Sequence, residues 1–204
     1  MTAQTDLYDS ILADVLTLTN RPDLTAETGI ALRSATLSVH SKAAYPRDCT
    51  TQLVKIPNAS YLTSIDAQLL LPRLRGLSRI QLVDVNYVPL EFPAIEIIEI
   101  DDIKDAEYKV YRNDVAYIAG TAVNIRSTVL GYGFLVEYFQ LPNVRRDSYN
   151  SWIAQLAPDV IVYTAAALVF ATNGNEEKSK SYLSYVNSML QPEMLANFLT
   201  SITR

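Results

Sequence analysis

Few side chains in this sequence are suited to catalysis, and the clearest are one histidine and one cysteine. His40 is followed by Ser41 and, further on, by Asp48, but the members of a Ser-His-Asp triad meet in space rather than in sequence. The chain also lacks the pattern of a nucleophile elbow. We therefore predict a packing or capping role for His40. Cys49 has no histidine partner within sequence reach, which favours a half-buried structural thiol.

Carboxylates form the second group with chemical potential. They cluster between positions 96 and 107, at Glu96, Glu99, Asp101, Asp102, Asp105 and Glu107. Such oxygens suit a hard cation, but the spacing and central glycine of a calcium-binding loop are absent. A carboxylate pair can also hydrolyse glycosidic bonds, although nothing in the sequence fixes such a pair across a cleft. The favoured interpretation is a solvated face, with a glycan-acting or cell-wall-acting enzyme as the remote alternative.

Arginines occur in two small groups, one made of Arg73, Arg75 and Arg79 and the other of Arg145 and Arg146. In an acidic chain, such groups indicate interface ion pairs rather than contacts to nucleic acid. The sequence contains no dinucleotide-binding, phosphate-loop or zinc-protease motif. We therefore expect no enzyme activity, no catalytic residues, no metal site and no cofactor.

The composition excludes several classes of protein. The chain has 204 residues, a formal net charge of -5 and a single cysteine, which excludes a disulfide scaffold and argues against a general nucleic-acid binder. Only 19% of its residues are charged, against roughly 25% in ordinary soluble domains. Tyrosine is abundant, with 13 residues. Because tyrosine is amphipathic and enriched at interfaces, this composition indicates surface that a partner covers.

The sequence predicts no signal peptide and no membrane contact. Its start lacks the basic and apolar regions of a secretion signal. The most apolar stretch, residues 160–171, is shorter than the roughly 20 residues that cross a bilayer. We expect this stretch to form a helix that is buried on all sides.

Helices are expected at the start of the chain, over residues 1–48. Asp6 is placed to cap a first helix that ends near Pro22, and Thr25 to cap a second. The second helix should stop at Tyr45, because a residue before proline disfavours helix.

The middle of the chain, residues 49–147, reads as short strands. Alternating or β-branched patterns occur at residues 52–56, 61–65, 78–85, 115–119, 121–126 and 134–140. Turns are expected at residues 57–58 and 131–133, and Gly120 should join two strands in a hairpin. Residues 95–100 are ambiguous between strand and short helix, and a one-turn helix is expected over 101–105. Many short strands between turns favour an antiparallel sandwich or barrel.

Helices are expected again over residues 148–204. Ser148 is placed to cap a short helix, Pro158 to begin the next, and Gly174 to end it. Asn175 can cap a further helix, which Pro192 should break or kink. The predicted fold is therefore α+β: residues 1–48 and 148–204 form a helical bundle, and residues 49–147 form a central antiparallel β lobe, a sandwich or barrel.

Three stretches of the chain together resemble a known family. The first is residues 31–40 (ALRSATLSVH) followed by 45–48 (YPRD); the second is 115–120 (VAYIAG) with 136–142 (VEYFQLP); the third is 151–158 (SWIAQLAP) leading into 165–170 (AAALVF) and 174–177 (GNEE). In their order they are similar to the head-to-tail adaptor, or connector, proteins of tailed bacteriophages, including the tail tubular A proteins of short-tailed phages. The resemblance covers nearly the whole chain as a pattern of elements with short motifs.

The resemblance implies a structural virion protein at the head-tail junction, made in the host cytoplasm. Such adaptors form a ring, expected to be a dodecamer, that binds the portal protein, meets the tail nozzle or other tail proteins, and extends the DNA channel used in ejection. DNA would pass without specific binding. We expect contacts with the portal or neighbouring subunits at Trp152, Phe198, Leu199, Ile202 and Arg204. A tail-completion or tail-tube protein elsewhere in the virion is the main alternative.

Overall fold

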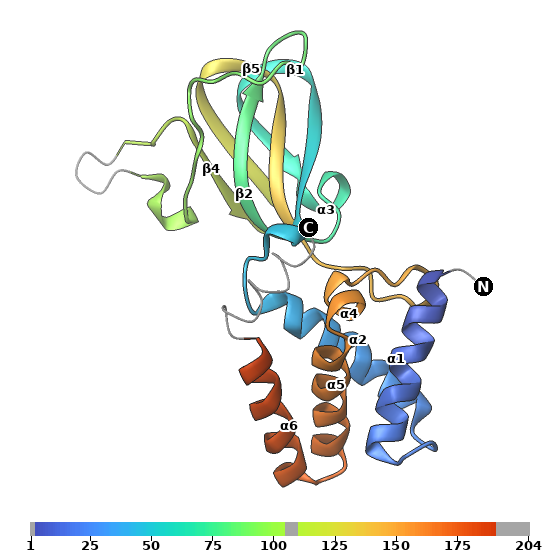
Figure 1. The fold of residues 1–204 in the computed structure, drawn as a ribbon. Coiled ribbons are helices and arrows are strands. Elements are labelled where there is room, and N and C mark those ends of the chain that lie inside the picture. The colour runs from blue at the N-terminus through green and yellow to red at the C-terminus, as the bar shows by residue number, and fades with distance from the viewer. Residues whose placement is uncertain (1–2, 105–109, 191–204) are drawn as a thin grey trace. The chain divides into compact units, whose positions relative to one another are not determined.

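The computed structural model describes residues 3–104 and 110–190, and the chain divides into two compact units (Figure 1). One unit combines Met1–Ala44 with Pro142–Arg204, and the other is Tyr45–Leu141. Within the described residues there are six α-helices and one five-stranded mixed sheet, an architecture consistent with α+β.

The boundaries between the units lie a few residues from the predicted positions, 48 and 147. The 3-10 helix Pro46–Asp48 contacts the long strand of the sheet, so these residues belong to the β unit. Past the second boundary, Asn150 N–H donates to Asn143 O at 3.1 Å. That bond ties the linker after Leu141 to the helical unit.

The helical unit is organised around one apolar helix. Its helices are α1 (Ala3–Thr19), α2 (Thr25–Ser41), α4 (Trp152–Leu156), α5 (Pro158–Thr172) and α6 (Glu176–Met189). The apolar run identified in the sequence is α5, which contacts the other four helices and is buried along most of its length. In Figure 1, α5 and α6 lie side by side as the two halves of a hairpin.

Several predicted helix ends are confirmed where one local residue decides them. Pro158 opens α5, Gly174 follows its end with a φ of +75°, and the Asn175 side chain accepts a hydrogen bond from Lys178 N–H at 3.2 Å. Gly174 tolerates this left-handed conformation because it has no Cβ.

Three predicted caps are wrong. Ser148 lies in a 3-10 turn, and Ser151 caps α4 instead, accepting from Ala154 N–H at 3.1 Å. Thr25 is the first residue of α2, and its hydroxyl donates to Pro22 O at 3.2 Å. Helix α1 begins at Ala3, which puts Asp6 inside the first turn, where its charge still suits the helix dipole.

The β unit contains β1 (Cys49–Asp66), β2 (Leu74–Val83), β3 (Glu96–Ile97), β4 (Val115–Ala119) and β5 (Ala122–Gln140), with the short helix α3 (Ala67–Leu70) after β1. Strand β5 pairs with β1 along both halves, with β2 along its second half and with β4 along its first half. The pairing of β3 with β4 is parallel, so the sheet is mixed and not purely antiparallel as predicted. The ambiguous residues 95–100 contribute β3, and a 3-10 helix follows over Ile100–Ile103.

The predicted turns at 57–58 and 131–133 do not interrupt the strands. Strand β1 runs through Pro57 with a register shift between Lys55 and Ser60. Strand β5 runs through Gly131 and Gly133, where the chain needs glycine for close approach. A Cβ atom on Gly133 would lie 2.7 Å from Val54 O. The predicted hairpin at Gly120 is confirmed, with a φ of +60° between β4 and β5.

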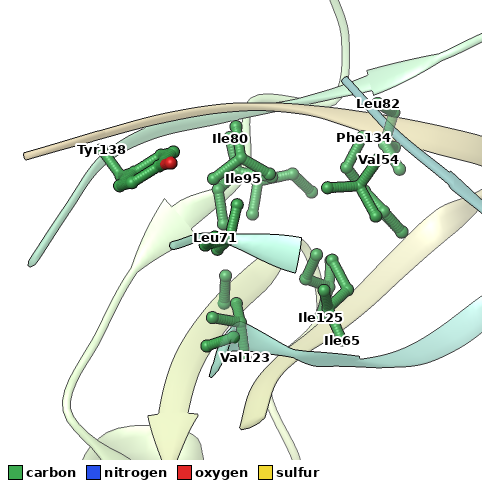
Figure 2. Packing of buried hydrophobic residues seen from close by; sticks show 13 residues of the cluster. Val54, Ile65, Leu71, Ile80, Leu82, Ile95, Val123, Ile125, Phe134 and Tyr138 are labelled. Atoms are coloured by element: carbon green, nitrogen blue, oxygen red, sulfur yellow. The ribbon is translucent and has the colours of Figure 1, made fainter. Parts of the chain in front are cut away.

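The core of the β unit lies on the inner face of this bent sheet. Figure 2 shows buried side chains from β1, β2 and β5 converging with Leu71 and Ile95. Along β5, Val123 and Ile125 point into this core, so residues 124 and 126 between and after them face outward. None of the helices within the described ranges is long and apolar enough to cross a membrane.

Candidate interaction surface

His40 and Ser151 meet inside the helical unit, although 111 positions separate them in the sequence. His40 Nε2 and Ser151 Oγ are 2.9 Å apart, and the two residues are 1% and 0% exposed. The Ser151 hydroxyl also accepts the capping bond from Ala154 N–H. A hydroxyl so enclosed cannot reach a substrate. The contacts of His40 are those of the packing role predicted for it.

The same buried polar cluster continues to Tyr149 and Thr36, which the sequence analysis did not identify. Their hydroxyl oxygens are 2.8 Å apart, and the Tyr149 ring meets that of Tyr8 edge-on at 5.4 Å. Burial raises the pKa of the Tyr149 phenol, and hydrogen bonds with Thr36 and Ser151 partly oppose that increase. The cluster links α1, α2 and the segment before α4, and its role is to specify packing.

The acidic cluster does not form a metal-holding group in the part of the chain that the structure describes. Glu96 forms an ion pair with Arg112, and Glu99, Asp101 and Asp102 are exposed, as predicted for a solvated face. Across residues 3–104 and 110–190, no group of three or more histidine, cysteine, aspartate or glutamate side chains could hold a metal. Asp105 and Glu107 lie outside the described residues.

The arginines have different surroundings. Arg146 forms a two-pronged ion pair with Asp9 of α1, with N–O distances of 2.7 and 2.6 Å, and this interaction holds the pKa of Asp9 below its usual range. That pair is within the chain, whereas the sequence suggested an interface pair. Arg73 and Arg75 border a hollow of about 360 Å³ beside α3.

Exposed apolar side chains are concentrated in the β unit. Among the described residues, every large hydrophobic side chain with substantial exposure belongs to Tyr45–Leu141, with the exceptions of Ile30, Leu183 and Tyr185. Groups of exposed large apolar side chains are candidate sites of protein contact. The β unit is therefore the leading candidate for an interface.

The best-defined part of this surface is a loop over residues 84–90, which we call the apolar loop. Its exposed members are Val85, Tyr87 and Val88, at 63%, 40% and 55%. The Asp84 carboxylate accepts hydrogen bonds from Asn86 and Val88 N–H, both at 2.8 Å. At the end of the loop, Leu90 N–H donates to Leu82 O at 2.8 Å. The loop thus holds its apolar side chains outward in a fixed backbone conformation.

Side chains on the adjoining strands extend the apolar loop. Lys55 of β1 lies over the Tyr87 ring, with Nζ 4.3 Å from the centroid. Further along the β1–β5 pairing, Ser60 aligns with Gly131, and the residues that follow these two, Tyr61 and Tyr132, are exposed. The tyrosine excess noted in the sequence is therefore divided between this surface and buried positions such as Tyr138 and Tyr149.

Only one of the predicted interface residues lies within the described residues. Trp152 is half-buried: its ring packs edge-on against His40 at 5.8 Å, and it borders a small apolar hollow with Met189 and Leu190. The other four, Phe198, Leu199, Ile202 and Arg204, lie outside the described residues.

A second apolar surface in the helical unit is a groove between α2 and α5, with a volume of about 360 Å³. Ile30 and Ala31 of α2 face Leu168 and Ala171 of α5 across it, and Ile30 is 57% exposed.

No protein-family model matches this chain, and no curated protein is significantly similar to it.

Proposed function

We propose that this chain is the subunit of a structural ring that joins the portal to the tail of a tailed bacteriophage and extends the DNA channel. The observation that carries this proposal is the apolar loop, a rigid and exposed group of Val85, Tyr87 and Val88. Apolar and aromatic side chains on an ordered backbone lose little conformational entropy on binding, so they make good interface anchors.

Two apolar surfaces on one chain suit a ring. Head-to-tail contacts need two different, complementary faces on every subunit, and a rotation that closes. The apolar surface of the β unit and the groove between α2 and α5 are two different faces, which this proposal assigns to those contacts. In this proposal the terminal helices act as a bundle and the bent sheet acts as a barrel-like lobe, and the ring is dodecameric.

The charge balance also supports passage of DNA rather than capture. Proteins that grip DNA do so by releasing counterions with lysine and arginine, and this chain carries 17 basic against 22 acidic side chains. A subunit of net charge -5 contributes little attraction to a polyanion in its channel.

Electron microscopy tests the proposal directly. The purified full chain, mixed with the portal protein of its phage at micromolar concentration, should form a ring stacked coaxially on the portal. Particles in which the portal stays bare, with the chain in free solution, would overturn it. Labelling of the chain in intact virions supplies a second readout, because a signal along the tail would favour a tail-tube or tail-completion protein instead.

A further inference from the structure

Arg126 lies on the outer face of the β unit, at the centre of the sheet. It belongs to β5 and aligns with Leu62 of β1 on one side and with Val115 of β4 on the other. Its neighbour Ile125 points into the core, so the Arg126 side chain crosses the opposite face. The Arg126 side chain is partly buried on this face.

The guanidinium of Arg126 is buried in part and incompletely paired. Its Nε atom is buried and has no hydrogen-bond acceptor among the described residues. Its best polar contact is Asn113 Oδ1, 3.5 Å from a terminal nitrogen, which is at the outer limit of a hydrogen bond. The centroid of the Tyr111 ring lies 5.1 Å from the guanidinium carbon, within the range of a cation–π contact.

The positive charge around Tyr111 is not neutralised within the described residues. Lys104 Nζ lies 5.1 Å from the centroid of the same ring, so two cations contact one aromatic ring. Two described carboxylates of the same part of the sheet, Asp114 and Glu96, have other partners. Asp114 accepts hydrogen bonds from Ser127 and from the backbone and hydroxyl of Thr128, at 2.8–3.1 Å. Glu96 forms its ion pair with Arg112.

A hollow of about 290 Å³ adjoins Arg126. It is bordered by residues whose side chains can donate hydrogen bonds, namely Ser64, Asn124 and Tyr117. All three lie on the face that Arg126 occupies, since Ser64 and Tyr117 both align with Asn124 in the sheet. The hollow is too small for a drug-sized ligand but large enough for a single anionic group.

We propose that this hollow is a binding site for a small oxyanion, a carboxylate or phosphate group that binds the guanidinium of Arg126. A planar guanidinium recognises such groups through parallel charge-assisted bonds, and a buried donor without an acceptor is costly. Ser64, Asn124 and Tyr117 provide further donors to the same group. The anion comes either from solution or from an acidic side chain on a second copy of the chain.

Nuclear magnetic resonance of arginine-labelled full chain tests the site. Dilute protein is titrated with inorganic phosphate and, separately, with acetate, while chloride keeps the ionic strength constant. The Nε–H resonance of Arg126, assigned by its loss in Arg126→Gln, should shift and saturate at millimolar anion. The exposed Arg79 serves as the matched control and should show only a small, non-saturating change. Equal, non-saturating shifts at both positions would overturn the proposal.

Two further arms decide the source of the anion and guard against misfolding. If the Arg126 resonance shifts with rising protein concentration and no added anion, and phosphate reverses the shift, the oxyanion is a carboxylate of a second copy. Tyr117→Phe removes one donor and should weaken phosphate binding several-fold with an unchanged backbone amide spectrum. This site does not depend on ring formation, so its failure leaves the proposed function standing.

Discussion

The hydroxyl of Ser151 has two roles in one buried place, as the N-cap of α4 and as the partner of His40. Ser151→Ala removes both, so we expect it to destabilise the chain by roughly 2–4 kcal/mol, from a lost cap of about 1 and an unsatisfied buried group of about 1–3. Urea denaturation followed by circular dichroism measures this. Ser10→Ala, at an exposed position of α1, is the control and should change stability by less than about 0.5 kcal/mol. Equal effects of the two variants would contradict the role of Ser151.

The buried Tyr149 phenol makes the stability of the helical unit depend on alkaline pH. Because burial raises its pKa above the unfolded value of 10.0, the folded state holds this proton more tightly. The stabilisation is complete below pH 10 and is lost as pH rises through the folded pKa. We expect the midpoint of urea unfolding to fall less steeply above pH 10 in Tyr149→Phe than in the native chain. An identical decline in both proteins would show that Tyr149 is not responsible.

At the residue scale, the sequence predicts features that one position decides by itself. Asn175, Gly174 and Pro158 act through local backbone chemistry, and each is found where it was expected. Ser151 could not be distinguished from Ser148, because its choice as a cap depends on the distant His40. The same limit applies to Arg126, whose surroundings come from three strands.

At the scale of elements, Gly133 tests whether β5 must be continuous. A Cβ atom there would lie 2.7 Å from the Val54 carbonyl oxygen, and a backbone atom cannot move away as a side chain can. We expect Gly133→Ala to destabilise the β unit by about 2–3 kcal/mol. The matched control is Gly76→Ala in β2, where no atom lies within 4 Å of the new methyl group. Thermal denaturation compares the two, and a similar melting temperature for both variants would contradict the close approach.

The long strands also explain why the sequence predicted shorter ones. Proline normally marks a turn because it cannot donate to a strand ladder. Pro57 is accommodated within β1 at the register shift between Lys55 and Ser60, where the regular pairing with β5 is interrupted. Glycine normally marks a turn as well, but Gly131 and Gly133 make room for Leu82 and Val54 of the neighbouring strands. Both exceptions depend on tertiary contacts, which a single sequence does not display.

At the scale of the whole molecule, the apolar loop predicts self-association. Val85 is 63% exposed, so Val85→Asp should leave the melting temperature within about 2 °C of the native value while it prevents ring formation, because a charge would be buried at the interface. Light scattering coupled to size-exclusion chromatography, in the presence of the portal, measures the assembled mass. Ser181→Asp, an equal change of charge at an exposed position of α6, is the control and should assemble normally. Native-like assembly of Val85→Asp would show that the apolar loop does not lie in the interface.

The order of helices, strands and helices is visible in the sequence, because helical and strand periodicities differ over long stretches. The division of the chain into a helical unit and a β unit follows that order. The path of the sheet could not be predicted: β5 pairs with three other strands, and β3 joins through a parallel contact of two residues. Such pairings depend on contacts between distant positions rather than on local preference.

The pairing of β1 with β5 has a consequence for the helical unit. These strands are the first and last of the β unit, and Cys49 aligns with Phe139, so the chain enters and leaves the β unit at adjacent points. The entropy lost on closing a loop rises with its length, yet a folded insertion with neighbouring ends behaves as a very short loop. Once the β unit has folded, the two halves of the helical unit are therefore tethered almost as closely as if the insertion were absent. Folding of the β unit thereby raises the effective concentration of α2 for α5.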